Sequence, residues 1–337
     1  MQDNAPARHR IPRRRTLPLT IGAGLTAVAL VAGMGAVANA GEVSQANAGT
    51  GTLAAPALVG WATQNGGTTG GGSAAPVTVT TASALISAMQ SSSAAVINVS
   101  GTITISGMQK VASNKTIRGV GANATITGGG LNIANARNVI IQNLNFRNAS
   151  DDSINVQYST NVWLDHLDMA EGYDGLLDIK RSSDFITVSY VHSHDHDKNM
   201  LLGHSDDNAG EDTGRLRVTY HHNWFDGTNQ RNPRVRFGNP VHVFNNYYSN
   251  VGSYGVASTE NAGVLVECNY FENVEDPYHL GEGSSDEGSL VARNNHMVNS
   301  GSGQTGGSVA SIPYSYSCDA ASSVKSIVTA QAGTGKI

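Results

Sequence analysis

The sequence predicts an all-β fold, a right-handed single-stranded parallel β-helix with short capping helices. Short β-branched or aromatic segments of alternating polarity recur between residues 139 and 295, and each ends at a polar residue, usually Asn. These polar positions are 145, 168, 192, 223, 246, 269 and 295, with no helical pattern between them. A repeat of about 20 to 30 residues is typical of a solenoid of stacked β-coils.

The composition agrees with this prediction. The 337 residues include 39 Gly and 30 Asn, and only 14% are charged, against about 25% in ordinary domains. Disorder would require low hydrophobicity with high net charge, and collagen would require Gly at every third position. In a β-sandwich the strands recur about every 8 to 12 residues, which fits this longer period poorly.

Stacked coils also explain the Asn residues. Coils stacked about 4.8 Å apart would place these side chains above one another, so that each amide bonds the next. Asn also tolerates the left-handed backbone that a tight corner needs. Solenoid ends must be covered; we expect a short helix over residues 80–89 to cap the first coil. A second short helix around Ala320–Ala332 is expected to pack on the side of the solenoid.

The first forty residues resemble an export signal. A basic stretch from Arg8 to Arg15 precedes an apolar stretch over 17–37, and Ala-Asn-Ala at 38–40 supplies a small-x-small cleavage pattern. A membrane anchor is the alternative, but Gly33 and Gly35 dilute the apolar run. The twin arginines 14–15 fit a twin-arginine signal in part, and a general secretory signal fits as well.

We therefore expect a secreted, extracellular protein with no membrane segment in its mature form. A Gly/Ala/Thr-rich segment over 41–75 is expected to run extended over the surface, ahead of one β-helix domain over 76–337. Export would allow a disulfide between Cys268 and Cys318, the two cysteines of the chain. The sequence leaves open whether they are bridged or are two buried thiols, because it does not give their separation.

The charge is divided unevenly along the chain. The whole sequence carries −5, of which residues 1–40 contribute +4, so the remainder carries −9. Such an acidic body is a poor binder of nucleic acid, whose affinity depends on Lys and Arg at the phosphates. It would also repel an acidic polymer unless a metal ion or a local basic patch intervened.

Six charged residues follow the polar positions at similar distances. Asp152 stands 7 residues after position 145, Asp174 and Asp178 stand 6 and 10 after 168, Lys198 stands 6 after 192, and Arg231 and Arg236 stand 8 and 13 after 223. In a solenoid, similar distances place side chains on one side, so these six are expected to line one groove. Three neighbouring carboxylates repel one another, and Ca²⁺, which prefers oxygen ligands, would remove that conflict.

Two further candidates for metal chemistry are weaker. Asp151 adjoins Asp152, but on an extended backbone it would point the opposite way. His192, His194 and His196 share one face of a strand, where alternate side chains stand about 7 Å apart. That spacing is too wide for a tetrahedral zinc site, so polar residues at a corner are the favoured interpretation.

Four motifs carry a family resemblance: Trp163-Leu-Asp165-His166, Asp174-Gly-Leu-Leu-Asp178-Ile-Lys180, His196-Asp-Lys198 and Arg231-Asn-Pro233-Arg-Val-Arg236. In this order they resemble the pectate lyases of polysaccharide lyase family 1, over about residues 60–313. The resemblance implies a parallel β-helix whose domain over 76–337 is catalytic. It also implies calcium ligands at Asp152, Asp174 and Asp178, a proton-abstracting base at Arg231, and substrate carboxylate binding by Lys198 and Arg236. Ser150 departs from relatives that have a further Asp there.

The implied reaction is calcium-dependent β-elimination on polygalacturonate, which gives 4,5-unsaturated oligogalacturonates. The base removes the C5 proton, whose acidity depends on neutralising the adjacent carboxylate, and cations beside Arg231 would favour its neutral form. An alkaline optimum and a monomeric enzyme are expected. Three alternatives stay open: a pectin lyase acting on methylated pectin, a polygalacturonase using Asp151 and Asp152, and a non-catalytic β-helix carbohydrate-binding protein.

Overall fold

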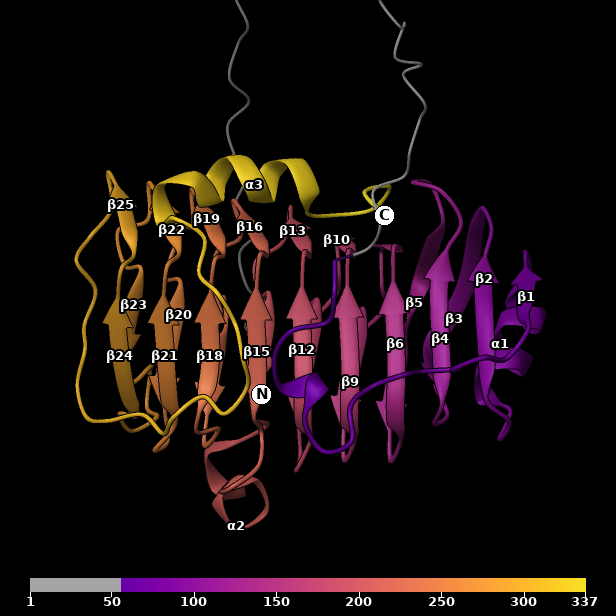
Figure 1. Ribbon diagram of the computed structural model, residues 1–337, viewed down its shortest axis with the longest axis horizontal. Coiled ribbons are helices and arrows are strands. Elements are labelled where there is room, and N and C mark those ends of the chain that lie inside the picture. Colours follow the sequence, from indigo (N-terminus) through magenta and orange to yellow (C-terminus); the bar gives the residue numbers. More distant parts are fainter. Residues whose placement is uncertain (1–55) are drawn as a thin grey trace, which may run out of the picture. The chain divides into compact units, whose positions relative to one another are not determined.

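The computed structural model describes residues 56–337 of the chain. The predicted export signal at 1–40 and residues 41–55 of the segment after it lie outside the described residues. Within 56–337, parallel strands stack into a β-solenoid, so the predicted fold class is confirmed (Figure 1). Among residues 56–337, the helices lack the length and hydrophobicity of a transmembrane span.

One sheet of the solenoid contains ten parallel strands, one from each coil. The seven segments recognised as a repeat all contribute to it. In spatial order its strands are β1 Pro76–Val79, β2 Ala95–Val99, β4 Lys115–Gly119, β6 Arg137–Gln142, β9 Thr160–Asp165, β12 Asp184–Ser189, β15 Val218–His221, β18 Val241–Phe244, β21 Gly263–Glu267 and β24 Ser289–Arg293.

The other sheet has fifteen strands in two arms, which meet at the long strand β5 (Thr125–Ala134). β3 (Thr102–Lys110) pairs with β5 from the other side. The first arm contains β8 Ile154–Gln157, β11 Leu177–Lys180, β14 Met200–Leu202, β17 Arg234–Arg236, β20 Val256–Thr259 and β23 Tyr278–Leu280. The second arm contains β7 Asn145–Arg147, β10 Asp168–Ala170, β13 His192–His194, β16 Trp224–Asp226, β19 Tyr247–Ser249, β22 Tyr270–Glu272 and β25 His296–Val298.

Side chains that point inward from both sheets form one continuous apolar core, which includes Ile126, Phe146, Leu164, Val188, Phe225 and Val264. The predicted Asn ladder is present in the late coils only. Asn246 Nδ2 donates to Asn269 Oδ1 at 3.0 Å, and Asn269 Nδ2 donates to Asn295 Oδ1 at 3.1 Å. In the earlier coils Asp168 is in register with Asn145 on one side and with His192 on the other. His192 is then in register with Trp224, the residue after Asn223. The prediction that all seven polar positions stack above one another was therefore wrong, because positions 145, 168 and 192 are shifted by one residue relative to positions 223, 246, 269 and 295.

Both predicted helices are present. α1 (Ala82–Gln90) begins after Thr81, whose hydroxyl accepts the Ala84 N–H at 3.3 Å, and it buries Leu85 and Met89 in the core. At the other end, α3 (Val324–Gln331) follows the 3₁₀ turn η3 (Ala321–Ser323). It lies across the second arm, where Val324 and Val328 contact Tyr247 (Figure 1). Two short helical turns, η2 (Asp206–Asn208) and α2 (Ala209–Asp212), project between β14 and β15.

The described part of the N-terminal segment is anchored more firmly than an extended surface strand would be. The 3₁₀ turn η1 (Trp61–Thr63) buries Trp61 against the ten-stranded sheet. The Trp61 N–H donates to Thr219 Oγ1 at 3.0 Å, and the Ala62 N–H donates to Thr187 Oγ1 at 3.1 Å. The segment thus covers the outer face of β12 and β15.

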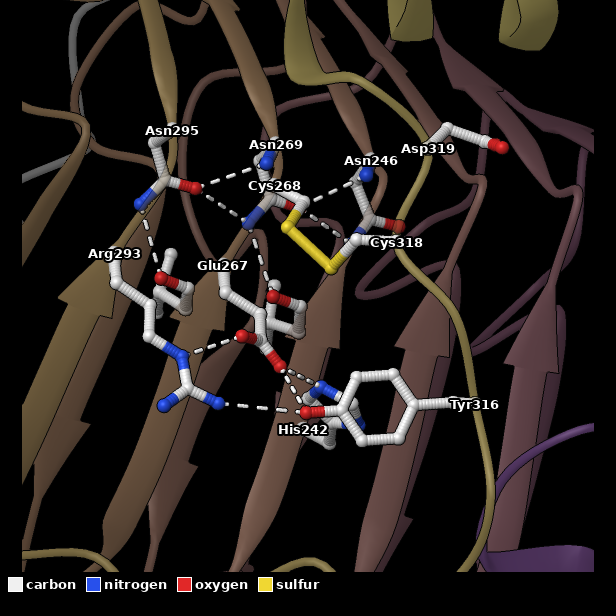
Figure 2. The surroundings of a disulfide bond; sticks show 12 residues. His242, Asn246, Glu267, Cys268, Asn269, Arg293, Asn295, Tyr316, Cys318 and Asp319 are labelled. Atoms are coloured by element: carbon white, nitrogen blue, oxygen red, sulfur yellow. Dashed lines mark hydrogen bonds and ion pairs between the residues drawn. A yellow bond between two sulfur atoms is a disulfide. The ribbon is translucent and has the colours of Figure 1, made fainter.

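The two cysteines are joined by a disulfide, with their Cα atoms 6.1 Å apart. Figure 2 shows that it connects the residue after β21 to the C-terminal tail, next to the Asn ladder. In the same neighbourhood Glu267 accepts hydrogen bonds from Arg293 Nε at 2.6 Å and from Tyr316 Oη at 2.6 Å, with His242 Nε2 at 2.9 Å. The tail is therefore held to β18 and β21 by covalent and polar contacts together.

Candidate active site

The six predicted site residues all belong to the first arm of the fifteen-stranded sheet or to the turns that enter it. Asp152, Asp174, Lys198 and Arg231 stand in the turns before β8, β11, β14 and β17, whereas Asp178 and Arg236 are on β11 and β17 themselves. Successive strands of a sheet lie about 4.8 Å apart. The six residues thus form a band over four consecutive coils, which we call the charged strip.

The acidic end of the charged strip is built on β8 and β11. Asp152 and Asp178 are 4% exposed. Asp152 Oδ1 accepts the Gly175 N–H at 3.0 Å, and the Lys180 ammonium lies 3.4 Å from Asp152 Oδ2 and 3.3 Å from Asp178 Oδ2. One ammonium thus bridges two buried carboxylates.

The pKa values of these groups reflect crowding in a dry environment. Burial, and then the nearby Asp152 charge, raises the pKa of Asp178 to about 7. Burial also raises the pKa of Asp152. Burial by itself would lower the pKa of the Lys180 ammonium. The negative charges of Asp178 and Asp152 have the larger effect and raise this pKa above its ordinary value.

Asp174 has a more open environment, with about half of its side chain exposed. Lys198 Nζ donates to Asp174 Oδ1 at 2.8 Å. This hydrogen bond lowers the pKa of Asp174, and the positive charge of Arg231 acts in the same direction. Lys198 and Arg231 therefore lie within electrostatic range of the acidic end, as their predicted positions on neighbouring coils require.

The carboxylates of the acidic end fit a calcium ion. One oxygen from each of Asp151, Asp152 and Asp174 lies within 4.8 Å of the others. Asp178 Oδ1 is buried and has no hydrogen-bond partner among residues 56–337. A Cβ at Gly175 would lie 2.9 Å from that oxygen and 3.0 Å from Asp152 Oδ1, so the close approach needs glycine. An all-oxygen donor set with an unsatisfied buried oxygen is the chemistry that Ca²⁺ prefers.

Asp151 was expected to point away from this group, and that expectation was wrong. Residues 150–151 form a bend instead of an extended strand, and the bend turns the Asp151 carboxylate toward Asp152 and Asp174. Lys180 ends the motif that begins at Asp174, but the sequence predicted no role for it. Its position two residues after Asp178 on one strand placed it on the same face, and that signal could have identified it.

At the basic end, Arg231 is held on an anchored turn. Its own backbone is left-handed (φ 62°), and the following Asn232 is fully buried. Asn232 Nδ2 donates to the Tyr254 carbonyl at 2.9 Å, and Asn232 Oδ1 accepts from Thr228 Oγ1 at 2.8 Å. The Arg231 Nε is buried and has no hydrogen-bond partner in the described part of the chain. A rigid turn thus presents a guanidinium that the fold itself leaves partly unsatisfied.

Arg236 is in a different situation. Its Nε donates to Asp206 Oδ1 at 2.5 Å, and its Nη1 donates to the Gly203 carbonyl at 3.3 Å. Asp206 belongs to η2 and also accepts from Ser285, which in turn bonds Arg234. The fold therefore fixes Arg236 through a carboxylate that sequence reasoning did not identify. No motif near residue 206 marked it, because the contact depends on where the η2 loop folds back.

A parallel β-solenoid with carboxylates and cations on successive coils of one sheet presents a long charged surface, and comparison with known proteins identifies its family. Residues 27–337 match the family model described as pectate lyase. A probable pectate lyase A of Aspergillus flavus is 43% identical over 81% of this chain and 87% of its own length. Pectate lyase A of Aspergillus niger is 40% identical over 87% of this chain and 94% of its own. The chain belongs to the pectate lyase family.

Solved structures give the same result. The crystal structure of a pectate lyase from Bacillus sp. N165 in complex with trigalacturonate superposes with a TM-score of 0.76 at 33% identity, covering 83% of this chain and 99% of that one. The pectate lyase II structure from Xanthomonas campestris has a TM-score of 0.71 at 28% identity. The family resemblance inferred from the motifs is thus confirmed, with fungal as well as bacterial relatives.

Proposed function

We propose that this pectate lyase cleaves polygalacturonate by calcium-dependent β-elimination and releases 4,5-unsaturated oligogalacturonates. The observation that carries the proposal is the contrast within the charged strip. The unsatisfied oxygen of the buried Asp178 lies two coils from Arg231, whose Nε also has no hydrogen-bond partner within residues 56–337. An acidic polymer would bind here once calcium occupies the acidic end, because the bound cation and the basic end would then both attract its carboxylates.

Within this proposal Asp152, Asp174 and Asp178, with Asp151 beside them, would hold the calcium ion. Bound there, calcium would supply positive charge for the substrate carboxylate and for the negative charge that develops during reaction. Lys198 and Arg236 would bind substrate carboxylates. Lys198 can exchange its bond to Asp174 for one to substrate, whereas Arg236 is oriented by Asp206.

Arg231 would act as the base. It takes the C5 proton, the electrons of that C–H bond form the C4–C5 double bond, and the C4–O bond breaks. The departing oxygen is then protonated, which leaves one unsaturated end and one new hydroxyl end. A free guanidinium stays protonated up to about pH 12, so a guanidine base is favoured by alkaline solution. An alkaline optimum follows from this role.

We also propose that the enzyme is exported and acts as a monomer outside the cell. The basic and apolar pattern of residues 1–40 supports export. The Cys268–Cys318 disulfide is consistent with an oxidising compartment. N-terminal sequencing of the protein recovered from culture medium should begin at Gly41, and an intact N-terminus would contradict cleavage after Ala40.

The deciding experiment measures ultraviolet absorbance of unsaturated product from polygalacturonate, with and without a chelator. Activity should disappear with the chelator and return with Ca²⁺. Full activity in excess chelator would contradict the calcium mechanism. A preference for highly methylated pectin would instead favour a pectin lyase, and binding without product would favour a carbohydrate-binding protein.

A further inference from the structure

A second group of metal-ligating side chains lies on the other arm of the fifteen-stranded sheet. Asp168 is the first residue of β10, and His192 and His194 are on the neighbouring β13. One ligand atom from each residue lies within 4.8 Å of the other two. Their side chains are 15%, 19% and 21% exposed, so an ion in solution can reach them.

The two histidines approach each other more closely than alternate residues of a flat strand would. Their rings stack with centroids 4.4 Å apart, and Trp224 of β16 stacks on His192 at 4.2 Å. Both rings turn toward Asp168: His192 Nδ1 lies 2.9 Å from Oδ2, and His194 Nε2 lies 3.1 Å from Oδ1. The spacing argument against a zinc site therefore fails for this pair. His196 is directed elsewhere, with its Nε2 2.8 Å from the Asp174 carbonyl.

The outer ring nitrogens provide an independent observation. His194 Nδ1 lies 2.7 Å from Asp195 Oδ2, and His192 Nε2 lies 3.4 Å from Asp226 Oδ2. A metal-ligating histidine usually donates its other N–H to a carboxylate or carbonyl, which fixes the tautomer and aims the lone pair at the metal. Both histidines have this arrangement, and the other nitrogen of each ring lies at hydrogen-bond distance from the Asp168 carboxylate, at 2.9 and 3.1 Å.

We propose that Asp168, His192 and His194 bind a divalent first-row transition-metal ion, zinc in particular. Two imidazole nitrogens and one carboxylate are a typical zinc donor set, and partial exposure leaves a position for water. Ligands about 2.0–2.1 Å from a tetrahedral zinc are separated by roughly 3.3 Å, close to the observed nitrogen–oxygen distances of 2.9 and 3.1 Å.

The surrounding charge also favours a dication. Three carboxylates, those of Asp168, Asp195 and Asp226, face the two histidines, and the one cation in contact with Asp168 is Arg147 in the described part of the chain. The Arg147 guanidinium donates to Asp168 Oδ1 and to the Asp168 carbonyl. It therefore fixes the carboxylate on one side and leaves Oδ2 directed at His192.

The test is a calorimetric titration of the full chain with ZnCl₂ at about pH 8, because alkaline pH favours the neutral imidazole that a metal ion requires. Excess Ca²⁺ is present to occupy the carboxylates of the charged strip. We expect one zinc ion per chain, and a Co²⁺-substituted sample should show the intense visible bands of a four-coordinate site. His192→Gln and His194→Gln should weaken binding at least 10-fold, and Asp226→Asn about 10- to 100-fold.

The matched control is His296→Gln on β25 of the same arm, whose ring packs against Tyr270 with centroids 4.7 Å apart. This variant should bind zinc as the unmodified chain does. Absence of zinc binding overturns the proposal. So does binding that survives both histidine substitutions and disappears with Asp174→Ala, because the ion would then be at the charged strip. If a histidine variant loses its folded circular dichroism spectrum, Asp226→Asn decides the question.

Discussion

Two buried carboxylates in this solenoid have nearly equal exposure and opposite properties. Asp178 on the fifteen-stranded sheet is 4% exposed, and Glu267 on the ten-stranded sheet is 3% exposed. Asp178 has Lys180 on one oxygen and no partner on the other within residues 56–337, whereas Glu267 has three partners. Burial raises the pKa of Asp178 to about 7. At Glu267, burial acts in the same direction, but hydrogen bonds from His242, Arg293 and Tyr316 outweigh it and lower the pKa to about 2.

The difference shows how a fold distinguishes structure from function. A buried carboxylate whose hydrogen bonds are complete stabilises the fold. One whose hydrogen bonds are incomplete is a candidate to bind an ion or a substrate. Exposure alone would not have separated the two residues. The number of hydrogen-bond partners separates them. The following experiments test this difference between satisfied and unsatisfied buried groups.

The largest expected effect comes from Asp178. Asp178→Asn keeps the shape and removes one charge, so the calcium concentration needed for half-maximal activity should rise more than about 10-fold. In calcium-free protein the same change should increase thermal stability at neutral and alkaline pH, because it removes a buried charge. Activity assays across a calcium series and calorimetric melting in chelator measure the two effects. An unchanged calcium requirement would show that Asp178 is not a ligand.

Arg231→Lys is expected to lower kcat by about 10²-fold or more, the range attributed to a general base, with KM little changed. Lysine retains the charge but alters reach and proton affinity. Arg236→Lys is the matched control and should mainly raise KM, since its guanidinium is oriented by Asp206 to bind substrate. A kcat near normal for Arg231→Lys would mean that only charge is needed at this position.

Removing the Cys268–Cys318 disulfide tests the contacts of Glu267, because the disulfide holds the tail that carries Tyr316. Cys318 is two residues from Tyr316, so replacing both cysteines with Ser releases the tail that supplies one of the Glu267 hydrogen bonds. The bridge closes a sequence separation of 50 residues, for which loop entropy gives about 4 kcal/mol. Urea unfolding should report a loss of that order, with kcat in calcium unchanged. A stability equal to that of the unmodified chain would contradict the entropic estimate.

The smallest effect is expected for Glu267→Gln, about 1–3 kcal/mol of stability at pH 7. Its pH dependence is the sharper result. Because the folded-state pKa of Glu267 is depressed from 4.5 to about 2, its contribution is present above pH 4.5 and is lost as the pH falls through about 2. The raised pKa of Asp178 has the opposite sign: in calcium-free protein, stability decreases as the pH rises from 3.8 through about 7. The difference in stability between the unmodified chain and each variant, plotted against pH, should therefore rise with pH for Glu267→Gln and fall with pH for Asp178→Asn.

Much of this organisation could be predicted from the residues. The period of the alternating segments identified the ten-stranded sheet, and similar spacings of 6 to 8 residues placed Asp152, Asp174, Lys198 and Arg231 in successive turns of one arm. The predictions failed where a local bend or a distant loop decided the geometry. Asp151 joins the acidic group because residues 150–151 are not extended, and Asp206 reaches Arg236 from a loop 30 residues away. Similarly, Asp168 and His192 were taken as ladder positions because polarity alone does not reveal a register shift of one residue.

The C-terminal tail has a consequence for how this molecule unfolds. Repeat solenoids behave as one-dimensional arrays in which each unit is stabilised only by its neighbours, so that end units can fray independently. Here the tail is bonded to Cys268 at one end, and further on its Gly333 N–H donates to the Tyr190 carbonyl, Thr334 to Asn145, and the Gly335 N–H to Asn143. These contacts connect coils that do not touch one another. The C-terminal tail thereby makes the opening of one coil between residues 143 and 268 depend on the opening of the others. Hydrogen exchange across these residues should report a single opening free energy instead of a gradient along the array.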